Sequence, residues 1–218
     1  MTTRWKTRRP STEQTVNMNH YAYGEKLARD FYICDGLTAS EKLLGKILVH
    51  HSPEGITAGR IVELEAYMGE GDRGCHAFGG RRTARTEIMY AVGGHAYVYL
   101  IYGMYCCMNI IVGGQDIPHC IFLRALEPVD GIELMKKRRG TDTLRQLCSG
   151  PGKLCIAMGI DKSLYGADLC GERLWLEDDG FTPEIIRGRR INIDYAGEDA
   201  LRDWRFAVKG SRFLSAKI

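Results

Sequence analysis

Two glutamates and a tyrosine alternate within residues 60–68: Glu63, Glu65 and Tyr67. Side chains two residues apart lie on the same face of a β-strand, so the pattern predicts two carboxylates and a phenol in a row. The other positions of this strand would form an apolar face for the core: Val62, Leu64, Ala66 and Met68. A carboxylate in such a row can take a proton from water or stabilise a developing cation, although a solvated strand face is the simpler interpretation of the pattern alone.

A glycine-rich loop follows this strand over residues 69–80 and contains His76. Loops that follow strands commonly carry functional side chains, which favours a site over a solvated face. A lone loop histidine is more often incidental than a ligand, and Cys75-His76 has no partners at a zinc-ligand spacing. We therefore expect no metal in this protein.

Four tyrosines fall within residues 97–105, which are typical of a β-hairpin that breaks at Tyr102-Gly103. Tyr97 and Tyr99 would share one face of the sheet, and Tyr102 would project beyond it at the turn. A shelf of tyrosines behind an exposed tyrosine suits a protein that holds a flat aromatic ring and wedges a stack of rings apart. In a basic chain we expect those rings to be nucleobases.

Basic residues cluster at residues 81–85, 136–139 and 187–190. Such clusters are commonly solvated faces, but the first lies between the carboxylate strand and the tyrosine hairpin, so we expect it to contact phosphates. Gly150-Pro151-Gly152-Lys153 is a second candidate phosphate site, because free backbone N–H groups point outward at a helix start. The net charge of +3 permits an anionic partner without requiring one.

The length and composition bound the class of protein. A chain of 218 residues with 44% hydrophobic residues can bury one sizeable core. We predict a disordered basic tail at residues 1–20 and a single domain at residues 21–218. The chain lacks an apolar leader and a membrane-length apolar run, so we expect an intracellular protein with reduced cysteines: nuclear if eukaryotic, cytoplasmic or nucleoid-associated if bacterial.

The sequence also predicts the elements that position these residues. Thr38 and Glu41 form a capping box for a short helix that Gly45 ends. Strands are expected at residues 46–50, 60–68 and 120–126, and helices at residues 129–139 and 151–158, ended by Gly140 and Gly159. Short strands are expected near three later positions: Trp175, Ile191 and Phe206. Strands dominate the middle of the chain without the regular alternation that builds a parallel sheet.

An ordered set of motifs runs through residues 43–215: Gly59-Arg60-Ile61-Val62-Glu63, Glu65-Ala66-Tyr67, His76, Gly79-Gly80-Arg81 with Thr83 and Arg85, Tyr97-Val98-Tyr99, Ile101-Tyr102-Gly103-Met104, Met108-Asn109, Leu123-Arg124-Ala125-Leu126-Glu127-Pro128, Leu147-Cys148-Ser149-Gly150-Pro151, Lys153-Leu154-Cys155, and Arg205-Phe206 with Val208-Lys209-Gly210-Ser211. Together these motifs resemble the alkyladenine (3-methyladenine, methylpurine) DNA glycosylase family. The resemblance implies a mixed α/β (α+β) fold: a single compact domain with a curved antiparallel sheet, a protruding β-hairpin and surrounding helices.

The resemblance implies catalytic roles for three matched positions. Glu65 would be the general base that activates water. Arg124 and the backbone carbonyl of Val208 would hold that water. No lysine falls within the matched pocket motifs, so we expect plain hydrolysis to an abasic site without a Schiff base.

The resemblance also implies contacts with the substrate. The flipped base would be enclosed by four residues: Tyr67, His76, Tyr99 and Asn109. The base would stack on Tyr67, and Asn109 would reject guanine. Two residues of the hairpin would intercalate into the duplex: Tyr102 and Met104. Apart from the resemblance, we expect five basic residues to contact the DNA backbone: Arg81, Arg82, Arg85, Lys153 and Lys209.

These implications predict a repair glycosylase that flips 3-methyladenine, 7-methylguanine, hypoxanthine or ethenoadenine out of damaged double-stranded DNA and hydrolyses the N-glycosidic bond. We expect no cofactor, no membrane contact and a monomer. Two alternatives stay open. A DNA-kinking module would need Tyr102 and the arginines but not Glu65. A glycoside hydrolase could pair Glu63 with Glu65, whose Cα atoms would lie roughly 7 Å apart on a strand.

Overall fold

The computed structural model describes residues 23–218, so the predicted tail at residues 1–20 lies outside the described residues. The strands are β1 (Glu25–Lys26), β2 (Ile47–Ser52), β3 (Gly55–Met68), β4 (Ala96–Ile101), β5 (Tyr105–Val112), β6 (His119–Asp130), β7 (Leu174–Asp178), β8 (Ile185–Gly188) and β9 (Arg205–Val208). The α-helices are α1 (Gly36–Leu43), α2 (Ile132–Arg139), α3 (Leu144–Leu147) and α4 (Pro151–Met158). Short 3-10 helices lie at Arg29–Tyr32, Gly69–Gly71, Phe78–Gly80, Glu87–Tyr90, Lys162–Leu164 and Asp194–Leu201.

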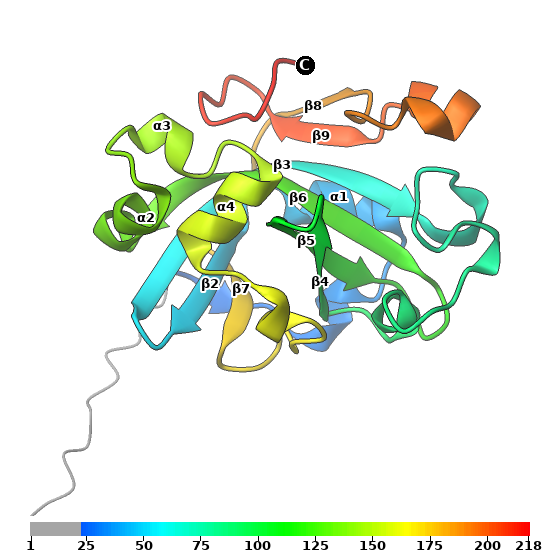
Figure 1. Ribbon diagram of the computed structural model, residues 1–218, viewed down its shortest axis with the longest axis horizontal. Coiled ribbons are helices and arrows are strands. Elements are labelled where there is room, and N and C mark those ends of the chain that lie inside the picture. Colours follow the sequence, from blue (N-terminus) through cyan, green and yellow to red (C-terminus); the bar gives the residue numbers. More distant parts are fainter. Residues whose placement is uncertain (1–22) are drawn as a thin grey trace, which may run out of the picture.

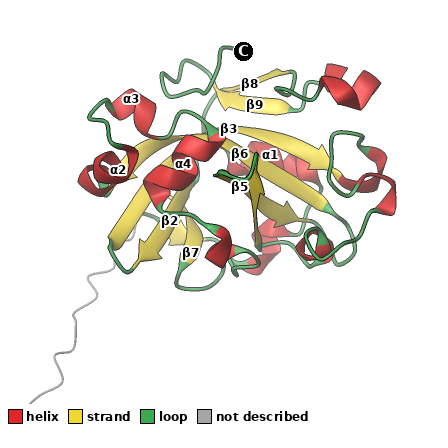
Figure 2. Cartoon of the chain, in the orientation of Figure 1, coloured by secondary structure: helices red, strands yellow, loops and turns green. Residues whose placement is uncertain are grey.

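The strands form one antiparallel sheet with the order β1-β7-β2-β3-β6-β5-β4, and β9 joins β3 to β8. The sheet is not closed, and helices surround it (Figure 1). Figure 2 shows α2 and α3 at one side of the sheet and α4 across the middle of the view. The predicted mixed α/β fold with an antiparallel sheet is confirmed. Across residues 23–218, no helix has both the length and the apolar character of a membrane span.

Alternation along the strands separates two groups of buried side chains. The main core contains Leu64 of β3 and Val98 of β4, together with Leu154 of α4. Tyr97 is buried in a second cluster, against which Tyr67 packs. Neighbouring residues of a strand face opposite sides of the sheet. The aromatic row therefore lies on the face turned away from the main core.

A bulge interrupts β3 at the first of the two glutamates. Its pairing with β6 shifts register on both sides of Glu63. Ile61 and Leu64, three positions apart, both lie in the main core, whereas Val62 packs in a separate cluster with Phe213. The prediction that Val62 shares an apolar face with Leu64 is therefore wrong, because one extra residue reverses the facing of the residues before it. The predicted alternation is present from residue 64 onward.

The first helix starts earlier than predicted. Its cap is Asp35 and not Thr38, since the Asp35 carboxylate accepts the N–H groups of Leu37 and Thr38 at 3.0 and 3.1 Å. A side-chain acceptor at this position satisfies backbone donors that the helix itself leaves free. Gly45, at φ 87°, follows the end of α1 as predicted.

The second helix starts later than predicted. Residues 129 and 130 extend β6, and Gly131 at φ 68° turns the chain before α2 begins at Ile132. The predicted ends at Gly140 and Gly159 are confirmed, with φ of 63° and 71°. Both are left-handed conformations that glycine adopts without strain.

The tyrosine hairpin is confirmed. β4 and β5 pair from Ala96 opposite Ile110 to Ile101 opposite Tyr105. Tyr102 occupies the turn at φ 51°, an uncommon conformation for a residue with a side chain, and 82% of its surface is exposed. The turn therefore presents this tyrosine to solvent.

The C-terminal segment joins the sheet through β9 and β3. β9 pairs with β3 from Glu63 opposite Ala207 to Glu65 opposite Arg205. The chain after β9, coloured red, runs along the top of the view beside β8 and β9 (Figure 1). Arg205 donates to the carbonyl of Ala216 at 2.6 Å. These contacts bring the last residues of the chain close to the two glutamates of β3.

Candidate active site

A cavity of about 880 Å³ lies beside the tyrosine hairpin. Its wall brings together many of the residues that the sequence predicts for the site: Tyr67, His76, Arg85, Tyr99, Tyr102, Arg124 and Lys153. They come from β3, the loops around it, the hairpin, β6 and the start of α4. The volume falls in the usual range of ligand-binding pockets. Segments far apart in the sequence thus meet around one opening.

Glu65 is fully buried beneath residues that line this cavity. Its Oε1 accepts the Ile191 N–H at 2.8 Å and lies 3.1 Å from Nη1 of Arg124, and its Oε2 accepts the Tyr67 hydroxyl at 3.0 Å. A carboxylate has about four acceptor positions, so one is left for a further donor. Burial raises the pKa of Glu65, opposed by Arg124, the Ile191 N–H and the Tyr67 hydroxyl. A carboxyl group with a raised pKa is suited to general-base catalysis.

Arg124 is held from behind by the other glutamate. Its Nε donates to Oε1 of Glu63 at 3.0 Å, and its Nε and Nη2 each donate to the Ser215 hydroxyl at 3.3 Å. Glu63 is fully buried and also accepts Nε of Arg205 at 2.8 Å and the Ser215 hydroxyl at 2.7 Å. The two glutamates therefore differ: Glu63 anchors two guanidinium groups, whereas Glu65 contacts residues of the cavity wall.

His76 is packed among tyrosines at the inner end of the cavity. Its Nδ1 lies 2.9 Å from the Tyr97 hydroxyl, and its ring centroid lies 4.9 Å from that of Tyr99. The Arg85 guanidinium lies 4.7 Å from the Tyr99 centroid, on the same group of rings. Burial, assisted by Arg85 and Arg81, lowers the pKa of His76 to about 4. The imidazole is therefore neutral at physiological pH.

A smaller cavity of about 50 Å³ joins the four predicted pocket residues: Tyr67, His76, Tyr99 and Asn109. Asn109 is buried and oriented, since its Nδ2 donates to the Tyr97 carbonyl at 3.2 Å and its Oδ1 accepts Sγ of Cys120 at 3.7 Å. A fixed amide in a confined space can discriminate between purines by the group placed against it.

The predicted intercalating residues lie at the tip of the hairpin. Tyr102 and Met104 are 82% and 71% exposed, and Tyr105 beside them is 46% exposed. Tyr102 and Met104 therefore leave most of their surface open to solvent. They form an apolar edge next to the cavity that Tyr102 and Tyr105 line.

Val208 does not lie at this site. Its carbonyl accepts the Ser211 N–H at 3.2 Å, and the residue lines a different cavity of about 260 Å³. The backbone that reaches Glu65 belongs instead to Ile191, which lines the main cavity. The structure therefore does not place Val208 beside Arg124 in the wall of the main cavity. The strand predicted near Ile191 is also wrong, because β8 ends at Gly188 and residue 191 lies in the loop that follows.

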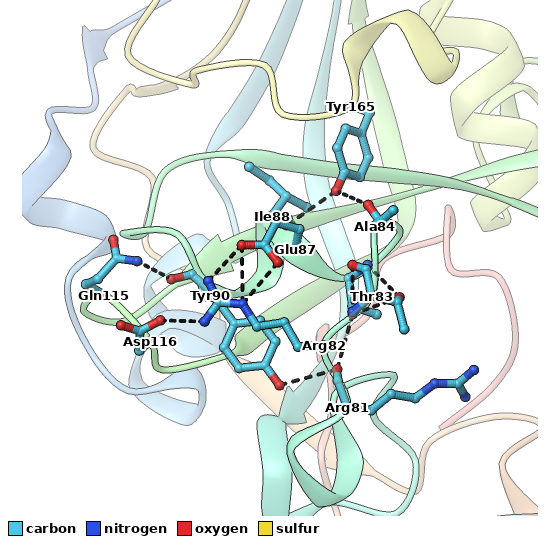
Figure 3. Close-up of polar contacts among 11 residues, drawn as sticks. Arg81, Arg82, Thr83, Ala84, Glu87, Ile88, Tyr90, Gln115, Asp116 and Tyr165 are labelled. Atoms are coloured by element: carbon cyan, nitrogen blue, oxygen red, sulfur yellow. Dashed lines mark hydrogen bonds and ion pairs between the residues drawn. The ribbon is translucent and has the colours of Figure 1, made fainter.

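The predicted backbone-contacting cations are divided by the fold. Arg85 and Lys153 line the main cavity, whereas Arg81, Arg82 and Lys209 do not. Figure 3 shows Arg82 between Glu87 and Asp116, with nitrogen–oxygen distances of 2.7 and 3.0 Å. The Arg81 side chain extends away from that group, and Lys209 pairs with Glu184.

Two residues of the site carry no sequence signal. Tyr195 is 72% exposed and lines both cavities. Arg190, in a cluster that the sequence suggests is solvated, is buried against Asp72, 118 positions away. Only the folded chain brings these partners together. Within residues 23–218, no three His, Cys, Asp or Glu side chains gather as a metal-binding group.

Comparison with known proteins identifies the family to which this chain belongs. The model of the methylpurine-DNA glycosylase family matches residues 30–212. This chain is a methylpurine-DNA glycosylase by family. The resemblance that the motifs suggest is thereby confirmed.

The match to three relatives of this glycosylase extends over nearly the whole length of each relative. A protein of Alkaliphilus oremlandii is 47% identical over 88% of this chain and 100% of its own. A protein of Clostridium acetobutylicum is 45% identical over 87% of this chain and 97% of its own. A protein of Methanocella arvoryzae is 48% identical over 88% of this chain and 96% of its own. All three are named for a 3-methyladenine DNA glycosylase. The family is one of DNA-repair hydrolases that act on N-glycosyl bonds.

Proposed function

We propose that this glycosylase flips an alkylated or deaminated purine out of duplex DNA and hydrolyses its N-glycosidic bond, leaving an abasic site. The observation that carries the proposal is the position of Glu65, buried between Tyr67 and Arg124 beneath an aromatic cavity. The substrates would be 3-methyladenine, 7-methylguanine, hypoxanthine and ethenoadenine. The names of the relatives support the first of these.

Extrusion of the base would use the hairpin and the cations of the cavity wall. Tyr102 would enter the gap that the base leaves, with Met104 beside it, and Arg85 and Lys153 would contact phosphates. A damaged or mispaired base costs less to unstack than a normal one, so extrusion itself favours lesions.

The chemical step would follow in the aromatic pocket. A purine alkylated on a ring nitrogen is cationic, stacks well on the faces of Tyr67 and Tyr99, and leaves easily. Glu65 would take a proton from water at its remaining acceptor position and stabilise the positive charge that develops on the sugar. Arg124, anchored by Glu63, would orient that water, and the Ile191 N–H would hold the Glu65 carboxylate in place.

A paired-carboxylate glycoside hydrolase is disfavoured, because Glu63 already binds Arg124, Arg205 and Ser215 and is fully buried. A module that only kinks DNA would have no use for a buried carboxylate with a raised pKa. Lys153, in the first turn of α4, lines the main cavity but not the smaller one, which supports simple hydrolysis without a Schiff base.

The products test this proposal. Duplexes with an end-labelled lesion strand are incubated with the wild-type protein, then divided between hot alkali and borohydride. We expect a free purine and a strand that breaks only in alkali. A borohydride-trapped protein–DNA adduct, or breakage before alkali, would contradict hydrolysis alone.

Replacing Tyr102 by Ala should slow excision from duplex DNA while leaving binding to undamaged duplex nearly unchanged. The lost stacking is worth ~1–3 kcal/mol, which is roughly 5- to 150-fold in the population of the extruded state. The measurement is single-turnover excision from matched double- and single-stranded substrates, because a single strand needs no wedge. If excision from the duplex is unaffected, Tyr102 is not a wedge.

Replacing Asn109 by Ser should relax the rejection of guanine, because the shorter side chain leaves room for the exocyclic amino group. We expect release of normal guanine to rise by roughly 10-fold, the scale set by one small group in a fitted pocket. Cys120→Ser, beside Asn109, is the matched control. An unchanged rate of guanine release would show that Asn109 is no gate.

The pH profile should have an acid limb set by Glu65. The base is active only when ionised, and burial raises its pKa above the ordinary value of 4.5, so activity is lost at a higher pH than for an exposed glutamate. His76, with a pKa of about 4, should add no limb near neutrality. Single-turnover rates between pH 4.5 and 8 check this, and a midpoint at or below 4.5 would contradict it.

A further inference from the structure

Aromatic rings and guanidinium groups alternate in a stack that starts at Tyr67, the ring on which the flipped base would stack and which we call the platform ring. The Arg190 guanidinium carbon lies 4.7 Å from the Tyr67 ring centroid and 5.0 Å from that of Trp204. The Arg202 guanidinium lies 4.7 Å from the same Trp204 ring. Tyr67 lines the main cavity, but Arg190 does not and its side chain is inaccessible to solvent. Arg190 thus packs on Tyr67 from the side away from the cavity.

The Arg190 side chain is fixed from several directions. Nη1 donates to Asp72 at 2.5 Å and to the Ala66 carbonyl at 3.0 Å. Nη2 donates to the other oxygen of Asp72 at 2.8 Å and to the Asp199 carbonyl at 3.1 Å. A planar guanidinium can make these contacts at once, and a lysine ammonium cannot reproduce them.

These contacts connect Arg190 to Glu65 and Tyr67, the proposed general base and the proposed stacking ring. Ala66, whose carbonyl binds Arg190, is the residue between Glu65 and Tyr67. Ile191, the next residue after Arg190, donates its N–H to Glu65 at 2.8 Å. The same side chain therefore fixes the orientation of the Tyr67 ring and the distance of a backbone donor from the carboxylate.

The buried charged groups around this residue are paired, including Asp199, whose carboxylate accepts Nε of Arg202 at 2.8 Å. Three carboxylates, Glu63, Glu65 and Asp72, face three guanidinium groups: Arg124, Arg190 and Arg205. An unpaired buried charge is costly, so each member constrains the others. Arg190 is the guanidinium of this set that touches the platform ring without entering the cavity.

We propose that Arg190 is a positioning residue of the glycosylase reaction, which holds Tyr67 for stacking and the Ile191 N–H against Glu65 without touching the substrate. This inference rests on the proposed function. Loss of the fixed contacts would let the platform ring and the carboxylate move relative to each other. A displacement of this kind is sufficient to slow a reaction in an otherwise intact site.

The test compares Arg190→Lys with Arg202→Lys. Arg190→Lys keeps the buried charge but loses the planar stack and most of the hydrogen bonds. Arg202 packs on the same Trp204 but does not contact Tyr67, so Arg202→Lys is the matched control. For each variant we would measure duplex binding, thermal unfolding and the single-turnover rate of 7-methylguanine release between pH 4.5 and 8.

Arg190→Lys is expected to release base roughly 10- to 100-fold more slowly with binding within about two-fold of wild type. The acid limb of its pH–rate profile should also move to higher pH. Glu65 would lose the Ile191 N–H as a hydrogen-bond donor, and a carboxylate that loses a donor is ionised less readily. Arg202→Lys should match wild type in rate and in pH profile. A rate and acid limb unchanged in Arg190→Lys, or a slower rate with an unmoved acid limb, would overturn the inference.

A second variant guards against misfolding. Arg190→Gln combined with Asp72→Asn removes the buried pair as a unit and leaves no lone charge. It should show the same upward move of the acid limb, and an unmoved limb in this folded variant also overturns the inference. If wild type releases no purine, or Glu65→Gln releases it as fast as wild type, the proposed function fails, a result distinguishable from failure of the Arg190 inference alone.

Discussion

Replacing Glu65 by Gln is expected to slow base release by ~10²–10⁴-fold, the usual contribution of a positioned general base. The amide has the same shape and can keep contacts with the Ile191 N–H and the Tyr67 hydroxyl, so the pocket should stay intact. It cannot take a proton from water or offset positive charge on the sugar. Single-turnover release from a duplex with 7-methylguanine measures the effect, with binding of the same duplex recorded in parallel.

The matched control for this variant is Glu63→Gln, two positions away on the same strand. Glu63 contacts the cavity only through Arg124, so its amide should reduce the rate far less than that of Glu65. Equal loss in the two variants would favour a paired-carboxylate mechanism. Release by Glu65→Gln at the wild-type rate would remove Glu65 from the reaction.

Replacing Glu63 by Ala is expected to lower the free energy of unfolding by ~3–5 kcal/mol. This change leaves Arg124 and Arg205 without the carboxylate that both share, in a region where neither is more than 7% exposed. It also removes the acceptor for the N–H and hydroxyl of Ser215, and with it a contact that holds the C-terminal segment on β3. Denaturant unfolding of wild type and variant measures the loss.

Two further variants separate charge from packing in that result. Glu63→Gln keeps an acceptor and should cost less than Glu63→Ala, and Ser215→Ala removes one partner only and should cost least. A loss below about 1 kcal/mol in Glu63→Ala, the level of an exposed ion pair, would mean that this network does not stabilise the fold.

Local sequence patterns predict much of the site. The two-residue alternation places Glu65 and Tyr67 on one face of β3, because strand geometry alone determines it once the register is regular. The break at Tyr102-Gly103 predicts the exposed wedge, since the turn conformation is local. The helix ends at Gly140 and Gly159 follow from the conformational freedom of glycine.

Partners brought together by the whole fold are not predicted from local patterns. The bulge at Glu63 depends on pairing with β6 and β9, which turns Val62 away from the core face expected for it. The Ile191 N–H reaches Glu65 across 126 positions, so no local motif around either residue predicts this contact. The same reason separates Arg82, held by Glu87 and Asp116, from Arg85 in the cavity wall.

The central claim is that this site excises damaged purines. It is tested most directly by single-turnover base release from duplexes containing 3-methyladenine, hypoxanthine or ethenoadenine, with an undamaged duplex of the same sequence as control and binding measured for each. We predict release of a free base from damaged duplexes and none from the undamaged one over the same time. Tight binding of damaged duplexes without release of a base from any of them would contradict the account and favour a module that flips bases without cutting.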